Sequence, residues 1–197
     1  TYSGKGKINE SEFKLNHPIK NKFLKKQIKQ VNFIDSNISY RFSSDKKNKV
    51  QANGKYQFDE NNYQVFNLKD IFFDKTLNID IDFEFINSFH INLINYKKKE
   101  NQVAKASINV ITSKDVLHLK KLNYTENKNL ITIENLKINK NDIISVKKIK
   151  VKTYDKNEVN NDFTLNFGKE IFIEGKKYDG KNLSKILNQK SKKNNIL

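Results

Sequence analysis

Residues 77–85 read Leu-Asn-Ile-Asp-Ile-Asp-Phe-Glu-Phe, an unbroken alternation of apolar and polar side chains. Successive side chains of a β-strand point to opposite faces of its sheet, so this alternation predicts a strand with one apolar and one polar face. The residues expected on the apolar face are Leu77, Ile79, Ile81, Phe83 and Phe85. The segment indicates a sheet whose two faces meet different surroundings.

The same alternation returns along most of the chain. It is found within residues 33–42, 50–58, 104–110, 117–119, 131–138, 144–151, 163–167 and 171–173. Polar clusters separate these segments, as at residues 45–48, 59–62, 125–129 and 155–157. Short alternating strands with such turns predict an antiparallel meander, and the lack of any continuous Val/Ile/Leu block disfavours a buried parallel sheet.

Helix signals are few. A short basic helix is expected within residues 19–30, and a second over residues 179–187, capped by Asp179 or Asn182. Residues 96–102, with their run of lysines, indicate an exposed turn. Two short helices cannot cover so wide an apolar face, so the sheet must close, fold on itself or keep the face for a ligand. We expect a mostly β protein: an extended antiparallel meander sheet curled into an apolar groove, with one or two short helices.

The chain has the size of one domain. Residues 1–188 are expected to form a single β-rich domain, and residues 189–197 a basic, frayed tail. The first residues contain neither an initiator Met nor an apolar signal region, so we expect a fragment of a longer protein with any targeting signal upstream. The longest run of large apolar residues is 71–73, too short to span a bilayer.

The charge is strongly basic but consists almost entirely of lysine. The sequence has 38 Lys+Arg and 22 Asp+Glu, a formal net charge of +16, and Arg41 is the one arginine. Nucleic-acid binding commonly uses the planar guanidinium fork, which is nearly absent here. Lysine also attracts lipid phosphates, and an AT-rich genome would itself favour Lys, Asn and Ile. The charge therefore indicates an anionic partner at most.

Catalytic groups are scarce. The chain has no Cys, and its three histidines, His17, His90 and His118, are far apart in sequence. Asp80 and Asp82 stand at the polar positions of their strand, where solvation explains them better than an acid/base pair does. We expect no enzymatic activity, no metal site and no cofactor.

The C-terminal third carries a further pattern. Its last strand and turn follow the order hydrophobic-x-hydrophobic-x-Gly-x-x-Tyr-Asp, with a Leu after it: Ile171, Ile173, Gly175, Tyr178, Asp179 and Leu183. This resembles the β-rich repeats of the AsmA-like superfamily, in particular the YhdP-type proteins of Gram-negative bacteria, most strongly over residues 104–188. The resemblance implies a groove-shaped sheet in the periplasm, anchored in the inner membrane through an upstream helix, that carries phospholipid acyl chains towards the outer membrane.

Pattern and resemblance together predict a non-enzymatic lipid-binding or lipid-transfer segment of the cell envelope. Its partners would be phospholipid acyl chains and, through segments outside this chain, a membrane; nucleic acid is disfavoured. The residues expected to line the groove are Leu77, Ile79, Ile81, Phe83, Phe85, Ile108, Val110, Ile131, Ile133, Ile171 and Ile173. Two alternatives stay open: a structural or adhesin-like β-sandwich domain, and a basic nucleic-acid-binding domain.

Overall fold

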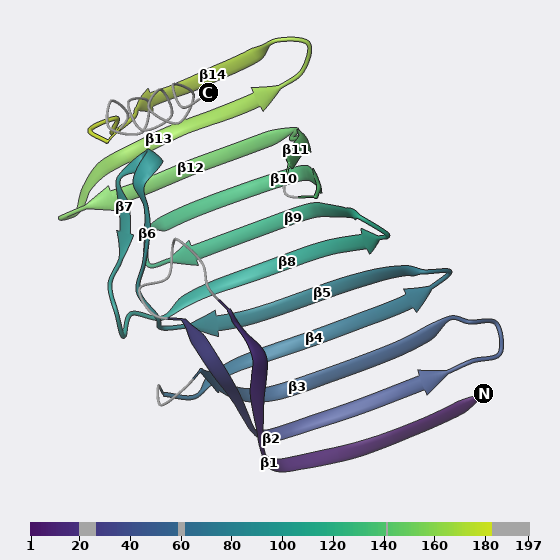
Figure 1. The fold of residues 1–197 in the computed structure, drawn as a ribbon. Helices are drawn as coiled ribbons and strands as arrows, with labels where there is room; N and C mark the ends of the chain where they lie inside the picture. The colour runs from purple at the N-terminus through teal and green to yellow at the C-terminus, as the bar shows by residue number, and fades with distance from the viewer. Residues whose placement is uncertain (20–26, 59–61, 141, 183–197) are drawn as a thin grey trace, which may run out of the picture.

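The computed structural model describes residues 1–19, 27–58, 62–140 and 142–182. They form one antiparallel sheet of twelve strands, in which consecutive strands are neighbours almost throughout (Figure 1). Its main path comprises β1 (Tyr2–Ile19), β2 (Ile28–Phe42), β3 (Asn48–Phe58), β4 (Gln64–Phe73), β5 (Thr76–Phe85), β8 (Ala104–Ser113), β9 (Val116–Glu126), β10 (Asn129–Asn139), β12 (Lys148–Asp155), β13 (Glu158–Phe167) and β14 (Ile171–Lys177). Strand β11 (Asp142–Ser145) pairs with β10 off this path.

The sheet is open. It is not closed into a barrel, and β1 and β14 stand at its two edges (Figure 1). The predicted antiparallel meander is therefore confirmed. The helix expected within residues 19–30 falls mainly on residues 20–26, and most of the helix expected over 179–187 falls on residues 183–187. Both segments lie outside the described residues, while Ile28–Gln30 belongs to β2.

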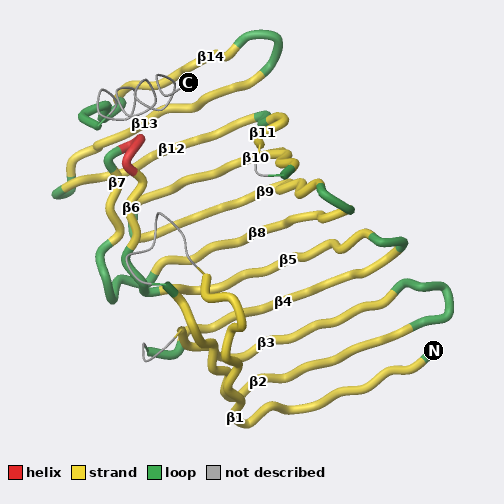
Figure 2. Tube along the Cα trace, in the orientation of Figure 1, coloured by secondary structure: helices red, strands yellow, loops and turns green. Residues whose placement is uncertain are grey.

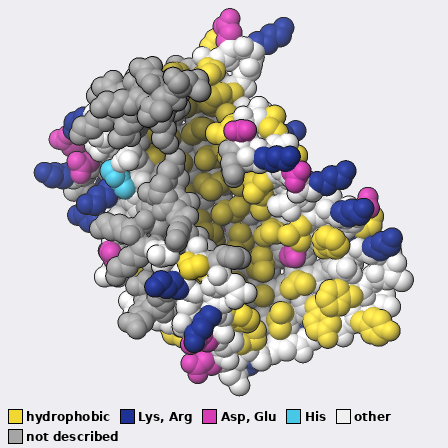
Figure 3. Space-filling model, viewed as in Figure 1, with side chains coloured by type: hydrophobic (Ala, Val, Ile, Leu, Met, Phe, Trp, Pro, Cys, Tyr) yellow, Lys and Arg dark blue, Asp and Glu magenta, His cyan; other side chains and the backbone are white. Residues whose placement is uncertain are grey.

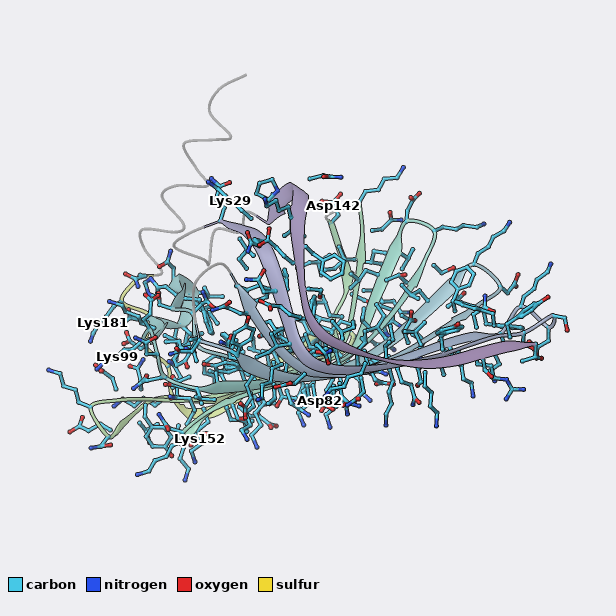
Figure 4. All side chains as sticks on the ribbon, turned by 90° about the horizontal axis from the view of Figure 1, so that it is seen from below. Lys29, Asp82, Lys99, Asp142, Lys152 and Lys181 are labelled. Carbon is cyan, nitrogen blue, oxygen red and sulfur yellow. The ribbon has the colours of Figure 1, made fainter. Side chains whose placement is uncertain are left out.

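Strand register places the apolar side chains on one face. Ile81 pairs with Leu68 on one side and with Ile108 on the other, and directly paired residues of an antiparallel sheet share a face. This face is the concave one. In Figure 4 the labelled side chains of Asp82 and Lys152 project from the opposite, outer face of the curved sheet.

Local irregularities help to curl the sheet. Asp35 in β2 and Asn135 in β10 adopt left-handed backbone conformations, with φ of 47° and 51°. The pairing of β2 with β3 shifts beside Asp35, which is the behaviour of a β-bulge. Bulges bend a strand and increase its twist. Beyond this point the connected ends of β1 and β2 rise from the plane of the sheet on its concave side (Figures 1 and 4).

A small hairpin covers one end of the apolar face. It consists of β6 (Phe89–Ile91), the 3-10 turn η1 (Asn92–Ile94) and β7 (Tyr96–Lys98), and it is inserted between β5 and β8. We call residues 89–98 the hairpin cap; η1 is the short helix at its tip in Figure 2.

The main hydrophobic core lies under the hairpin cap. Its buried members are Ile94, Tyr96, Ala104, Tyr124, Ile131, Val151 and Phe163. Residues 96–102 were expected to form an exposed turn, and this expectation is wrong for the first part of the segment. Tyr96 is only 3% exposed and Lys98 is fully buried, because both belong to a strand that packs on the sheet.

Candidate functional site

One line of residues crosses the whole concave face. A single row of directly paired positions, one from each strand of the main path, contains ten apolar residues and one glycine. We call it the apolar row: Gly6, Ile38, Ala52, Leu68, Ile81, Ile108, Leu122, Ile133, Ile149, Leu165 and Ile173. Adjacent strands lie about 4.8 Å apart, so the ten spacings give a length of about 48 Å.

The residues predicted to line a groove all lie on this face. Ile81, Ile108, Ile133 and Ile173 belong to the apolar row itself. The others occupy neighbouring positions at steps of two along the same strands: Leu77, Ile79, Phe83, Phe85, Val110, Ile131 and Ile171. The structure therefore brings all eleven to one surface, although Phe85 and Ile131 belong to its covered part.

The two ends of the strands differ. At the capped end the hairpin cap covers the face, whereas at the opposite end, which we call the open end, large apolar side chains remain exposed. Those on the concave face include Tyr40, Phe42, Phe72 and Leu117, with exposures of 39–45%, and the edge-strand residues Tyr2 and Ile171, with exposures of 80% and 62%. Figure 3 shows hydrophobic side chains as a band across the strands, with charged side chains along its rim. Contiguous exposed apolar surface of this kind makes the open end a candidate interaction site.

A buried hydrogen-bond network closes the capped end. The Glu126 carboxylate accepts hydrogen bonds from the Tyr96 hydroxyl at 2.7 Å and from the Asn129 amide at 2.7 Å. The hydroxyls of Tyr96 and Tyr124 are 2.5 Å apart. Burial raises the pKa of both tyrosines above the ordinary value of 10, so they remain neutral donors at physiological pH.

Lys98 is buried beside this network. Its ammonium donates to the carbonyl oxygens of Ile86 at 2.9 Å and of Lys99 at 3.0 Å, and it lies 5.3 Å from the ring centroid of Phe85. Desolvation lowers the pKa of Lys98 because it disfavours the charged form. Both acceptors are backbone carbonyls in the segments that flank the hairpin cap. Because the Lys98 ammonium holds these two segments together, we assign this lysine a structural role.

The segment after β14 fastens the hairpin cap to the sheet. The buried Asn161 amide donates to the carbonyl of Ile94 and to the hydroxyl of Thr153, each at 2.8 Å, and its oxygen accepts the backbone N–H of Asp179 at 2.9 Å. Asn95 donates to the Asp179 carboxylate at 2.9 Å, and this hydrogen bond lowers the pKa of Asp179. Asp179 also accepts the N–H of Lys181 at 3.1 Å.

Charge is sparse on the concave face. From β3 to β10 its paired positions carry two carboxylates, Asp70 and Glu126, and neither Lys nor Arg. Asp70 is not among the residues predicted from the sequence, although the sequence contains a signal for it. Phe66, Leu68 and Phe72 set a period of two, and Asp70 occupies the position where an apolar residue is expected.

The other candidate residues lie elsewhere. Asp80 accepts a hydrogen bond from Asn109 on the outer face, and Glu84 pairs with Lys105 at 3.1 Å on the same face. His118 contacts the side-chain oxygen of Asn135 at 3.2 Å. Among the described residues no group of His, Cys, Asp and Glu is arranged to hold a metal ion.

The fold and the concave face define a class of protein: an open, curled antiparallel β-sheet with an exposed apolar band on its concave face. No protein-family model, curated protein or solved structure matches the chain. Within the described part of the chain, no helix is both long and apolar enough to cross a membrane.

Proposed function

We propose that this chain binds phospholipid acyl chains along its concave face, as a non-enzymatic segment of a lipid-transfer protein. The resemblance to the AsmA-like superfamily extends the proposal: the segment would belong to a periplasmic protein, anchored in the inner membrane, that carries phospholipid towards the outer membrane. The observation that carries the proposal is the apolar row, which continues through all eleven strands of the main path.

The chemistry of this surface suits acyl chains. An acyl chain forms no directional contacts, and each methylene removed from water contributes about 0.8 kcal/mol. The hydrocarbon core of a bilayer is about 30 Å thick, so one acyl chain spans about 15 Å. The apolar row, at about 48 Å, is several times longer than one chain requires. Such a length favours passage of lipid along the groove, or binding of several chains, over a single closed pocket.

The wider architecture supports lipid over a β-sandwich. In a sandwich a second sheet of comparable size covers the apolar face. Here the second sheet of the described chain is the two-stranded one within the hairpin cap, and Phe42 and Phe72 at the open end are 45% and 42% exposed.

The nucleic-acid alternative has a weaker basis in the outer face. Some of its lysines are engaged by carboxylates, as in the ion pairs Lys105–Glu84 and Lys152–Asp162, and the chain has a single arginine, Arg41, for bidentate contacts with phosphates or bases.

Native mass spectrometry of the purified chain, incubated with vesicles of phosphatidylethanolamine and phosphatidylglycerol, tests the proposal. We expect bound phospholipid on the wild type and at least a tenfold loss on Ile81→Asp, because a carboxylate in the middle of the apolar row must be desolvated by the ligand. Asp82→Lys, one residue away on the outer face, is the matched control and should load normally.

Absence of bound phospholipid from the folded wild-type chain would refute the proposal, as would equal loading of the two variants. Circular dichroism spectra of both variants establish that they are folded. In a parallel titration, tight binding of an oligonucleotide that weakens steeply with salt would support the nucleic-acid alternative instead.

A further inference from the structure

Two carboxylates of the concave face, Glu126 and Asp70, differ in their partners. Glu126, at the capped end, receives hydrogen bonds from Tyr96 and Asn129. Asp70 lies on β4 towards the open end, and its Oδ1 is buried without a hydrogen-bond partner. A buried acceptor without a donor is costly, so native proteins supply one in nearly every case. The donor for Asp70 is missing from the described chain.

The neighbours of Asp70 on the concave face are apolar. Its direct partners across the sheet are Val50 in β3 and Ile79 in β5, and Leu68 and Phe72 flank it along β4. Partial withdrawal from water raises the pKa of the Asp70 carboxyl.

The closest hydroxyl along the same row of paired positions is turned away. Tyr40 of β2 pairs with Val50, one strand further from Asp70. Its ring lies over Gly4 of β1, where even a Cβ atom would come within 2.5 Å of the Tyr40 hydroxyl oxygen. The Tyr40 hydroxyl therefore points to the side of β2 that is remote from Asp70.

We propose that Asp70 is a headgroup site, which binds the primary ammonium group of an amphiphile, such as a phospholipid with an ethanolamine headgroup, while the apolar chain lies on the apolar row. This inference rests on the proposed function and names the chemical class of the ligand. The ammonium group of the ligand would donate hydrogen bonds to the Asp70 carboxylate, as Tyr96 and Asn129 do to the Glu126 carboxylate. Leu68 of the apolar row is the next concave position along β4, about 7 Å away, so a headgroup at Asp70 places its chain directly on the row.

Charge selects the ligand. A carboxylate in an apolar setting is best compensated by a cation that also donates hydrogen bonds. A neutral hydroxyl donates but brings no charge, and a fatty-acid carboxylate is repelled. No lysine or arginine occupies a paired concave-face position between β3 and β13 that could attract an anionic headgroup instead.

Three probes with the same chain test this assignment: dodecylamine, dodecanol and dodecanoate, each titrated below its micelle concentration by isothermal calorimetry. The wild type should bind the amine most tightly, the alcohol next and the carboxylate least. In Asp70→Asn the affinity for the amine should fall about tenfold while that for the alcohol changes little, because a hydrogen bond to a charged group is lost. Affinity for dodecanoate should rise.

Asp82→Asn is the matched control, since it removes one carboxylate from the outer face and should leave all three affinities unchanged. An unchanged ratio of amine to alcohol affinity in Asp70→Asn overturns the headgroup site. If the three probes bind the wild type equally, the headgroup site fails but the acyl groove stands. If none of them binds, the proposed function itself fails.

Discussion

The capped end and the open end of the concave face are made from the same strands and the same alternating pattern, yet they have different environments. At the capped end Val151 is 3% exposed, and the polar groups of Glu126 and Asn161 are hydrogen-bonded. At the open end Phe72 is 42% exposed and Asp70 has an orphaned oxygen. What distinguishes the ends is the hairpin cap.

The contrast separates stability from binding. Buried apolar area and satisfied polar groups contribute to folding, whereas apolar area left in contact with water contributes nothing until a ligand covers it. Substitutions at the capped end should therefore change the free energy of unfolding, and equivalent substitutions at the open end should mainly change binding.

The largest difference should come from one substitution made at both ends. Val151→Asp places a carboxylate in the core under the hairpin cap and should lower the free energy of unfolding by about 4 kcal/mol or more. Val110→Asp, on the uncovered part of the face, should cost about 1 kcal/mol, because its carboxylate reaches water. Urea unfolding followed by circular dichroism measures both; equal losses would contradict the distinction between the two ends.

The next effect concerns the fastening of the hairpin cap. Asn161→Ala removes three hydrogen bonds from a fully buried site and should cost about 3 kcal/mol. Asn166→Ala, in the same strand on the outer face, serves as the control and should cost less than about 0.5 kcal/mol. Thermal unfolding compares the two variants. A similar shift in both would mean that Asn161 does not hold the hairpin cap.

A smaller effect is expected from single hydroxyl groups. Tyr96→Phe removes a donor to the buried Glu126 carboxylate and should destabilise by about 1.5 kcal/mol. Tyr40→Phe removes a hydroxyl at the open end and should change stability by less than about 0.5 kcal/mol. Chemical denaturation at neutral pH measures both, and a larger loss for Tyr40→Phe would reverse the assignment of the two ends.

The smallest expected effect is the contribution of Asp70 to the pH dependence of stability. The pKa of Asp70 in the folded chain is raised above 3.8, so the folded state holds this proton more tightly than the unfolded state does. Stability without ligand should therefore decline as pH rises from about 3.8 through the folded pKa. Asp70→Asn abolishes that decline and should be more stable than the wild type at pH 7 by less than about 1 kcal/mol.

The control for this measurement is Asp82→Asn, which should show no such gain. Unfolding titrations of the three proteins at several pH values give the comparison. If Asp70→Asn loses stability at pH 7, the carboxylate has a partner in the folded chain and is not an orphan.

The sequence was sufficient for the faces of the sheet. The alternation around Ile81 and its counterparts assigned all eleven predicted residues to one surface, because a step of two residues is the geometry of a strand whatever surrounds it. The same alternation places Ile171 and Ile173 on this surface in β14, the last strand of the sheet.

The hairpin cap could not be predicted in this way. Its run of three lysines, residues 97–99, has the composition of an exposed turn. Lys98 is buried because the carbonyls of Ile86 and Lys99 accept its ammonium hydrogen bonds, and that arrangement exists only in the folded chain. Asp70 was detectable as a break in an alternation, but the absence of its hydrogen-bond partner depends on strands distant in sequence.

The meander order has a further consequence for cooperativity. Consecutive strands are also neighbours in space, so most pairings close short loops and the sheet can zip up from any hairpin. The long-range tie is the one between η1 and the residues after β14, where the Tyr178 hydroxyl donates to the Leu93 carbonyl across 85 residues of sequence. That tie encircles β8 to β14 and leaves β1 to β5 outside it. The N-terminal strands should therefore exchange their amide hydrogens through local opening, while the interior encircled strands, β8 to β13, should exchange mainly when the whole unit unfolds.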